Sequence, residues 1–218
     1  LFAPLNAAFS ALDVPMWYTV GNHDIDFEAD DDRTADDAFE QTYHPAYYAF
    51  EFGGVLFVSF DNVYWTGRFE GQQGTYRGEL GETQLGWFEQ LLGTTPPDQL
   101  VVLMQHIPLV SRFDGSRINT GDRHALYELI AERPNVVALC GHMHTQDHNI
   151  LQTGEDRWPG AEPFHHWQAV TASGCWWGGA ADERGIPHAT MMCGTPNGYT
   201  VGRFNGSTGG FELAYRAA

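Results

Sequence analysis

The sequence predicts an α/β fold whose sheet is largely parallel and whose C-terminal half is rich in β-strands. Three apolar runs, at residues 16–20, 100–104 and 136–140, have the continuous apolar character of strands buried on both faces. Apolar residues recur at helical spacing in residues 82–92 and 121–132, which lie between these runs. Strands that alternate with helices in this way are typical of a sheet with crossover connections.

The N-terminal part predicts a helix, a strand and a hairpin in that order. Apolar side chains at helical spacing predict a helix in residues 2–12, which ends before Pro15 and leads into the strand at 16–20. Residues 47–52 and 55–60 predict two strands joined at Gly53-Gly54, which suits a two-residue hairpin turn. Because an α/β domain rarely starts on a crossover helix, we expect an earlier strand to be absent from this chain.

The rest of the chain predicts a loop and then several short strands. The glycine-rich residues 67–81 predict a loop, in which Tyr76 and Arg77 either lean over a site or pack locally. After the helix at 121–132 and the strand at 136–140, short strands and turns dominate, with the last two strands forming a hairpin. The strands expected there are residues 146–151, 166–170, 199–205 and 211–216.

The composition restricts the class of protein and its partners. A chain of 218 residues suits one domain with a full hydrophobic core. With 28 acidic residues against 11 basic ones, all arginine, the net charge is −17. We therefore expect no nucleic-acid surface, because binding to a phosphate backbone needs many cationic contacts. We also expect no membrane span, because no apolar run approaches the length of a transmembrane helix.

Potential metal ligands follow three of the predicted strands. The strand at 16–20 is followed by Gly-Asn22-His23-Asp24, and the strand at 100–104 by Gln-His106. The strand at 136–140 is followed by Gly-His142-Met-His144. Ligands of open α/β sheets bind beyond the carboxyl ends of the strands, so we expect these side chains to share one site.

Other polar residues have two interpretations each. The acidic run at 28–37 is either a cation-binding loop or a solvated surface, and its composition favours the solvated surface. His165 and His166 are interpreted as structural residues rather than ligands. Trp176 and Trp177 either form an apolar wall beside a substrate or anchor their own loop.

The three cysteines leave the redox environment open. Cys140 lies in an apolar strand and is expected to be a small buried side chain. Cys175 and Cys193 are able to form a disulfide in an oxidising compartment, but their spacing does not require one.

In combination, these motifs resemble the calcineurin-like metallophosphoesterase superfamily. The resemblance rests on GNHD, on a strand that ends in His106 followed by Ile-Pro, and on GHMH, and it extends over about residues 16–216. A further stretch, residues 174–199, is similar to the bacterial branch whose members carry additional domains. The resemblance implies an α/β/β/α arrangement, in which a metallophosphoesterase-type β-sandwich is flanked by helices and lacks its first strands here.

The resemblance also implies roles for six residues in hydrolysis of a phosphomonoester or phosphodiester. Two divalent metals, Zn, Mn or Fe, activate a hydroxide and neutralise charge on the phosphoryl group. The residues implied as ligands are Asn22, His106 and His142 for one metal and His144 for the other. His23 is the implied phosphate contact and general acid, and Asp24 the residue that hydrogen-bonds its ring.

The chain departs from the family pattern before GNHD. The family has an Asp-x-His motif and a Gly-Asp-x-x-Asp-like motif there, whereas the nearest acidic residue in this chain is Asp13. We therefore expect residues 1–218 to be one phosphoesterase domain that is incomplete at its N-terminus and binds at most one metal well. Either the chain is a piece of a complete enzyme, or it is a catalytically inactive binding module. A mononuclear zinc hydrolase of another class is a third reading, but the chain has no HExxH-type base.

The expected partners follow from these interpretations. One is a small phosphorylated substrate, whose identity and binding residues the sequence does not specify. Another is a missing N-terminal segment or a partner chain that completes the sheet. Resemblance to secreted relatives favours an extracytoplasmic location.

Overall fold

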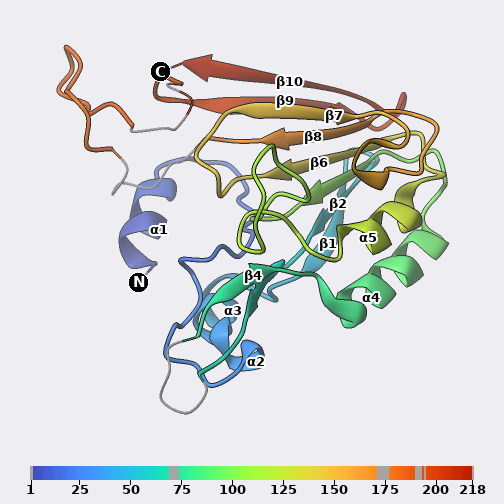
Figure 1. The fold of residues 1–218 in the computed structure, drawn as a ribbon. Coiled ribbons are helices and arrows are strands. Elements are labelled where there is room, and N and C mark those ends of the chain that lie inside the picture. Colours follow the sequence, from blue (N-terminus) through green and yellow to red (C-terminus); the bar gives the residue numbers. More distant parts are fainter. Residues whose placement is uncertain (1, 69–73, 171–176, 190–192, 194, 218) are drawn as a thin grey trace.

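Figure 1 shows a computed structural model of the chain, described for residues 2–68, 74–170, 177–189, 193 and 195–217. Its centre is a six-stranded sheet in the order β1-β2-β5-β6-β8-β7. Strands β2, β5, β6 and β8 are parallel to one another, and the edge strands β1 and β7 are antiparallel to their neighbours. The six strands are β1 (Tyr48–Phe52), β2 (Val55–Ser59), β5 (Val101–Met104), β6 (Val136–Cys140), β7 (Asp147–Leu151) and β8 (Phe164–Gln168).

Two helices cover one face of this sheet. They are α4 (Gly81–Thr94) and α5 (Arg123–Ile130), both near the bounds predicted from their apolar periodicity. Phe88 of α4 and Leu126 of α5 are fully buried against Val58, Leu103 and Ala138 of the sheet. This cluster is the largest core of the described structure, and it fixes the strands whose carboxyl ends hold the candidate site.

A β-hairpin covers part of the opposite face. It consists of β9 (Gly198–Asn205) and β10 (Gly210–Ala217), and Figure 1 shows it lying along the sheet. Phe204 and Leu213 of the hairpin pack on Val55, Val102 and Val137. The described residues therefore form three layers of the expected arrangement, helices, sheet and hairpin, and none of their helices covers the outer side of the hairpin.

A smaller unit lies beside the sheet. It contains the helices α1 (Ala3–Phe9), α2 (Asp32–Ala35) and α3 (Asp37–Tyr43) and the strand pair β3 (Val63–Trp65) and β4 (Tyr76–Gly78). Phe2, Phe39 and Trp65 form its core. The prediction of a loop over residues 67–81 was wrong at its C-terminal end, because β4 pairs with β3 there.

The acidic run at 28–37 is not simply a solvated surface. Asp31 caps α2 by accepting from the amide of Thr34 at 3.1 Å, and Oδ1 of Asp32 accepts from the amide of Trp65 at 2.5 Å. Glu28 forms an ion pair with Arg68. These carboxylates act as helix caps and tertiary contacts, which a count of charges does not reveal.

The strand expected at residues 16–20 is absent. This segment is extended, but it belongs to no sheet formed by the described residues. Side chains hold it instead: the hydroxyl of Tyr48 donates to the carbonyl of Tyr18 at 2.8 Å, and the hydroxyls of Thr19 and Ser59 lie 2.9 Å apart. An apolar run predicts an extended backbone, but pairing needs a neighbouring strand with free backbone groups.

The turn and the buried cysteine agree with the sequence. Gly53 and Gly54 have φ of 60° and 77°, as a two-residue type I′ hairpin turn requires. Cys140 is buried as a free thiol, and Cys193 is a free thiol near the surface. Cys175 lies outside the described residues. No helix among the described residues is long and apolar enough to cross a membrane.

Candidate metal centre

The candidate centre lies at the carboxyl ends of the adjacent parallel strands β5 and β6. His106 follows β5 by two residues, and Gly141 to His144 follow β6 directly. The backbone of Gly141 donates to the carbonyl of His106 at 3.1 Å, so the two segments remain side by side beyond the sheet. The parallel register of Met104 with Leu139 thereby brings together His106 and His142, which are 36 positions apart.

The turn after β6 has an unusual backbone. His142 and His144 have φ of 68° and 49°, in the left-handed region that costs a residue with a side chain about 1 kcal/mol or more. The amide of Met143 donates to the carbonyl of Gly141 at 2.8 Å, which closes the turn. Non-glycine residues held in this region occur most often at functional sites.

Three side-chain atoms converge at this point. Nε2 of His106 lies 2.6 Å from Oδ1 of Asn22, and Nδ1 of His142 lies 3.2 Å from the same oxygen. The two imidazole nitrogens are 3.1 Å apart. The predicted ligands Asn22, His106 and His142 therefore meet, although they are spread over 120 positions of the chain.

A count of protons shows that lone pairs face one another here. Nε2 of His142 lies 2.7 Å from the backbone carbonyl of Arg117, which only accepts, so a neutral His142 has its proton on Nε2 and a bare Nδ1. Oδ1 of Asn22 is also an acceptor only. At most one proton, on His106, is left for three acceptor atoms.

Both imidazoles are held in the neutral form. Burial, with the neighbouring His142 adding to it, lowers the pKa of His106 to about 3. Burial also lowers the pKa of His142, although the hydrogen bond to the carbonyl of Arg117 acts in the opposite direction. A neutral imidazole is the form that binds a metal, so the electrostatics of the pair suit a ligand role.

The turn at residues 21–24 positions Asn22. Gly21 lies so close to His106 that a Cβ on it would stand 3.0 Å from Nδ1 of the imidazole. Oδ2 of Asp24 accepts from the amide of Gly21 at 2.9 Å, so this carboxylate oxygen fixes the turn. The hydrogen bond expected between Asp24 and the ring of His23 stays a prediction. Burial raises the pKa of Asp24, and the bond from Gly21 opposes that rise.

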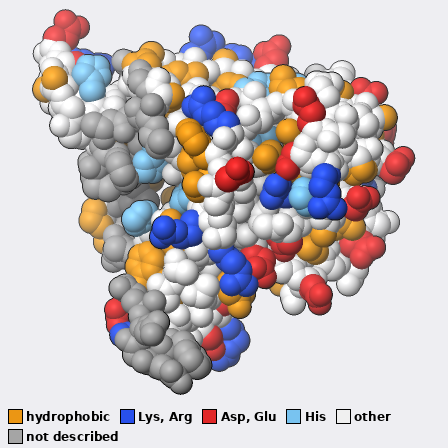
Figure 2. All heavy atoms as spheres, viewed as in Figure 1, with side chains coloured by type: hydrophobic (Ala, Val, Ile, Leu, Met, Phe, Trp, Pro, Cys, Tyr) orange, Lys and Arg blue, Asp and Glu red, His pale blue; other side chains and the backbone are white. Residues whose placement is uncertain are grey.

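The remaining predicted site residues line a cleft next to the convergent atoms. His23 and His144 both face this cleft, which has a volume of about 370 Å³. It is also lined by Tyr76, Arg117, Ile118 and Met143. Figure 2 shows histidine and arginine side chains lying together on this face of the molecule. Sequence reasoning did not single out Arg117, because its segment has no periodicity and no family motif.

The three convergent atoms fit one side of a metal coordination shell. Two ligands bound to one ion at about 2.0–2.2 Å, with angles of 90–109°, lie about 2.8–3.6 Å apart. Two of the three separations in the centre fall in this range, and the third is 2.6 Å. Nitrogen and neutral oxygen donors suit Zn, Mn or Fe. Among the described residues no three His, Cys, Asp or Glu side chains form a metal-binding group, so the third donor here is an amide.

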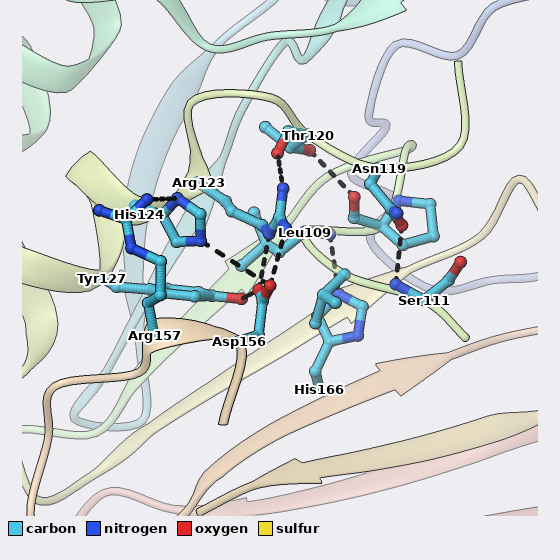
Figure 3. Close-up of polar contacts among 12 residues, drawn as sticks. Leu109, Ser111, Asn119, Thr120, Arg123, His124, Tyr127, Asp156, Arg157 and His166 are labelled. Carbon is cyan, nitrogen blue, oxygen red and sulfur yellow. Dashed lines mark hydrogen bonds and ion pairs between the residues drawn. The ribbon is translucent and has the colours of Figure 1, made fainter. Parts of the chain in front are cut away.

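A second polar cluster, which sequence reasoning missed, lies on the helix side of the sheet (Figure 3). Arg123 of α5 binds Asp156 through two hydrogen bonds of 2.6 and 2.7 Å, and the hydroxyl of Tyr127 donates to the same carboxylate at 3.2 Å. Nearby, the buried Nε2 of His166 accepts from the amide of Leu109 at 3.1 Å. This agrees with the structural interpretation of His166. We call Arg123, His124, Tyr127 and Asp156 the arginine–aspartate cluster.

Two further residues that the sequence pointed to, His165 and Trp177, have other surroundings. His165 lies 3.0 Å from His148 on the sheet, measured between Nδ1 and Nε2, and is remote in sequence from the centre. Nε1 of Trp177 is buried and has no hydrogen-bond partner among the described residues. Trp176 lies outside the described residues.

Comparison with known proteins identifies the family. The profile described as calcineurin-like phosphoesterase matches residues 1–146, and the profile of the C-terminal part of calcineurin-like phosphoesterases matches residues 165–218. A search of curated protein sequences found no match.

Two solved structures are similar to the chain. The structure of PhoD is 14% identical with a TM-score of 0.53, over 92% of this chain and 51% of that chain. A dimetal phosphatase from Danio rerio is 16% identical with a TM-score of 0.34, over 44% of this chain and 29% of that one. The chain thus spans about half the length of PhoD and shares its fold. Since the family profile covers 146 of its 218 residues, the chain belongs to the calcineurin-like phosphoesterases.

Proposed function

We propose that this chain carries the C-terminal part of a metal centre that hydrolyses a phosphomonoester or phosphodiester. The observation that supports it best is the convergence of Asn22, His106 and His142 on one point, with no more than one proton between three acceptor atoms. Divalent ions held by these residues would supply an activated water and would neutralise negative charge on the phosphate.

The residues of the chain have distinct roles in this proposal. Asn22, His106 and His142 hold one metal, and His144 contributes to a second. The carbonyl of Arg117 fixes the tautomer of His142, so that its Nδ1 faces the metal. His23, which lines the adjacent cleft, contacts the phosphate and protonates the leaving oxygen. Asp24 keeps the 21–24 turn in shape through its bond from Gly21.

A second function is a binding module that holds a single metal and does not turn over substrate. It is favoured by the donor set, since the described residues that line the cleft include no Asp or Glu. A dinuclear centre needs such a bridging ligand to hold two cations close together. The two functions differ in metal stoichiometry and in turnover.

Native mass spectrometry with elemental analysis, followed by phosphatase and phosphodiesterase assays, separates them. The measurement uses the native protein, purified with any upstream segment or partner chain. A hydrolase then retains two metals and cleaves p-nitrophenyl phosphate or its bis-ester, whereas a binding module retains one metal and cleaves neither. His106→Ala is expected to lose the metal in both cases. His188→Ala is the matched control, because His188 is exposed and does not line the cleft. Equal metal content in the two variants would contradict the proposal.

The partner and the location belong to the same proposal. An upstream segment or a partner chain supplies the missing metal ligands and pairs with the sheet, and the protein acts outside the cytoplasm. Purification of the native protein, followed by mass spectrometry, tests whether an upstream segment or a partner chain accompanies residues 1–218. Fractionation of the host cells tests whether the protein lies outside the cytoplasm.

A further inference from the structure

Arg117 places a permanent positive charge in the cleft beside the candidate centre. It is the only Lys or Arg among the described residues that line this cleft, and no Asp or Glu is among them. Within the described structure no carboxylate forms an ion pair with its guanidinium. Arg77 in β4 differs, because it forms an ion pair with Glu79, in which Nε of Arg77 lies 2.5 Å from Oε2 of Glu79. Arg117 is exposed, and in a chain of net charge −17 a cleft whose described lining has one arginine and no carboxylate favours an anionic ligand.

The segment that carries Arg117 is held in place by hydrogen bonds. The amide of Gly78 in β4 donates to the carbonyl of Ser116 at 2.7 Å, and the amide of Gly121 donates to the carbonyl of Gly78 at 2.7 Å. The buried side chain of Asn119 accepts from the amide of Ser111 and donates to the carbonyl of Phe113, both at 2.7 Å. A binding group on a rigid support loses little entropy when it engages a ligand.

The same contacts place an aromatic ring next to Arg117. Tyr76 is two residues before Gly78, and the Arg117 guanidinium carbon lies 5.8 Å from the centre of its ring. The ring of Tyr76 also stands edge-on to His142, with centroids 6.0 Å apart. Tyr76, Ile118 and Met143 give the cleft an apolar wall on the side next to the metal ligands.

We propose that Arg117 and Tyr76 set the substrate class of this site: a small phosphate ester of a planar, aromatic alcohol. The guanidinium binds non-bridging oxygens of the phosphate, which its planar fork of donors matches. The aromatic leaving group packs on Tyr76 and on the side chains of Ile118 and Met143. A volume of about 370 Å³ is at the lower end for ligand pockets and suits one ring with its phosphate. This inference rests on the proposed phosphoesterase function.

The same segment offers a matched control. Arg112 also lies over an aromatic ring, with its guanidinium carbon 5.3 Å from the centre of Phe113, and it is exposed. It does not line the cleft. Arg112→Ala therefore removes the same charge and the same kind of arginine–aromatic contact from the same loop, but leaves the proposed binding site intact.

The test measures binding of two phosphonates that the enzyme cannot hydrolyse. Phenylphosphonate and methylphosphonate carry the same anionic group, but only the first has a ring. Isothermal titration calorimetry with the purified chain, in the presence of Mn²⁺ or Zn²⁺, is expected to show tighter binding of phenylphosphonate. Arg117→Ala should weaken both ligands by about tenfold or more, as loss of charge-assisted hydrogen bonds implies. Tyr76→Ala should weaken phenylphosphonate alone, and Arg112→Ala neither.

The outcomes distinguish this inference from the proposed function. If Arg117→Ala and Arg112→Ala bind both phosphonates equally well, or if wild type does not prefer the ring or binds neither ligand, the inference fails. Metal content, measured separately, tests the centre: a wild type that binds phenylphosphonate but no metal overturns the hydrolytic function, and Arg117 and Tyr76 then define a binding site for an aromatic phosphate ester that is a ligand and not a substrate. Circular dichroism of each variant confirms that the fold is retained.

Discussion

The candidate metal centre and the arginine–aspartate cluster have polar contacts of similar length but differ in the charges that make them. In the cluster, the carboxylate of Asp156 is paired with the cation of Arg123 at 2.6 Å, and Tyr127 adds a donor. In the centre, the polar atoms of Asn22, His106 and His142 approach equally closely, yet none of them carries a positive charge.

This difference teaches how a structural polar cluster is distinguished from a ligand site. The cluster contains its own cation, so its geometry is complete within the chain. The centre brings together lone pairs that lack enough protons, and an external cation completes such a geometry. Two histidines in close contact are therefore informative only after the protons around them have been counted.

The largest expected effect comes from supplying and removing that cation. Zn²⁺ or Mn²⁺ at a hundredfold excess over Kd should stabilise the wild type by about 2.7 kcal/mol, or about 5–10 °C in Tm for a chain of this size. His106→Ala should abolish this response, because it removes one of the three convergent donors. Differential scanning fluorimetry with and without EDTA measures the effect. Retention of the full response in His106→Ala would mean that the metal binds elsewhere.

The second effect comes from breaking the cluster. Asp156→Ala should lower the free energy of unfolding by about 2 kcal/mol, because it leaves the half-buried Arg123 and the hydroxyl of Tyr127 without their partner. Urea unfolding measures the loss. The metal response should stay as in wild type, so a variant that loses both would show that the two regions depend on each other. Asp156→Asn retains an acceptor and is expected to lose less.

Much of the fold was predictable from local pattern. The apolar runs of β2, β5 and β6 and the helices α4 and α5 agree with the structure, because apolar periodicity reports burial directly. Proximity of Asn22, His106 and His142 was also predictable, since each follows an apolar run. The prediction of a strand at residues 16–20 was wrong, because an apolar run does not specify the neighbouring strand that sheet pairing needs.

The features that were not predictable depend on long-range contacts. Arg123 and Asp156 are 33 residues apart, and Asp156 adopts φ of 44°, which its residue type does not signal. Arg117 acquires its position from hydrogen bonds between its loop and β4. Short helices in the acidic run depend on caps such as Asp31 and on the contact from Trp65 to Asp32.

A third effect, on the pH dependence of stability, tests whether His166 belongs with the cluster as a structural residue. Burial lowers its pKa to about 3. The unfolded chain binds a proton at its ordinary pKa of 6.5, whereas the folded chain does not until about pH 3. The free energy of unfolding therefore falls as the pH drops through this window, with a slope of about 1.4 kcal/mol per pH unit from this group.

His166→Gln retains an acceptor for the amide of Leu109 and does not titrate. Its free energy of unfolding should depend less steeply on pH between 6 and 4, as urea titrations at several pH values measure. A slope equal to that of wild type would assign the acid sensitivity to other groups. His165→Gln is the control, because His165 is a partly exposed histidine on the same strand whose pKa is also lowered by burial. It should change the pH dependence of the free energy of unfolding less than His166→Gln does.

The smallest effect compares two histidines with strained backbones. His44, at the end of α3, has φ of 106° and ψ of −177°, a region that only glycine adopts readily, and His142 has φ of 68°. His44→Gly should raise the free energy of unfolding by about 0.5–1 kcal/mol without changing the metal response, because the relief of strain exceeds the entropy cost of glycine. His142→Gly should leave the metal-free chain equally or slightly more stable but abolish metal binding. If His142→Gly instead destabilises the metal-free chain by more than 1 kcal/mol, the strained turn after β6 serves packing, and the distinction between the centre and the cluster loses its basis.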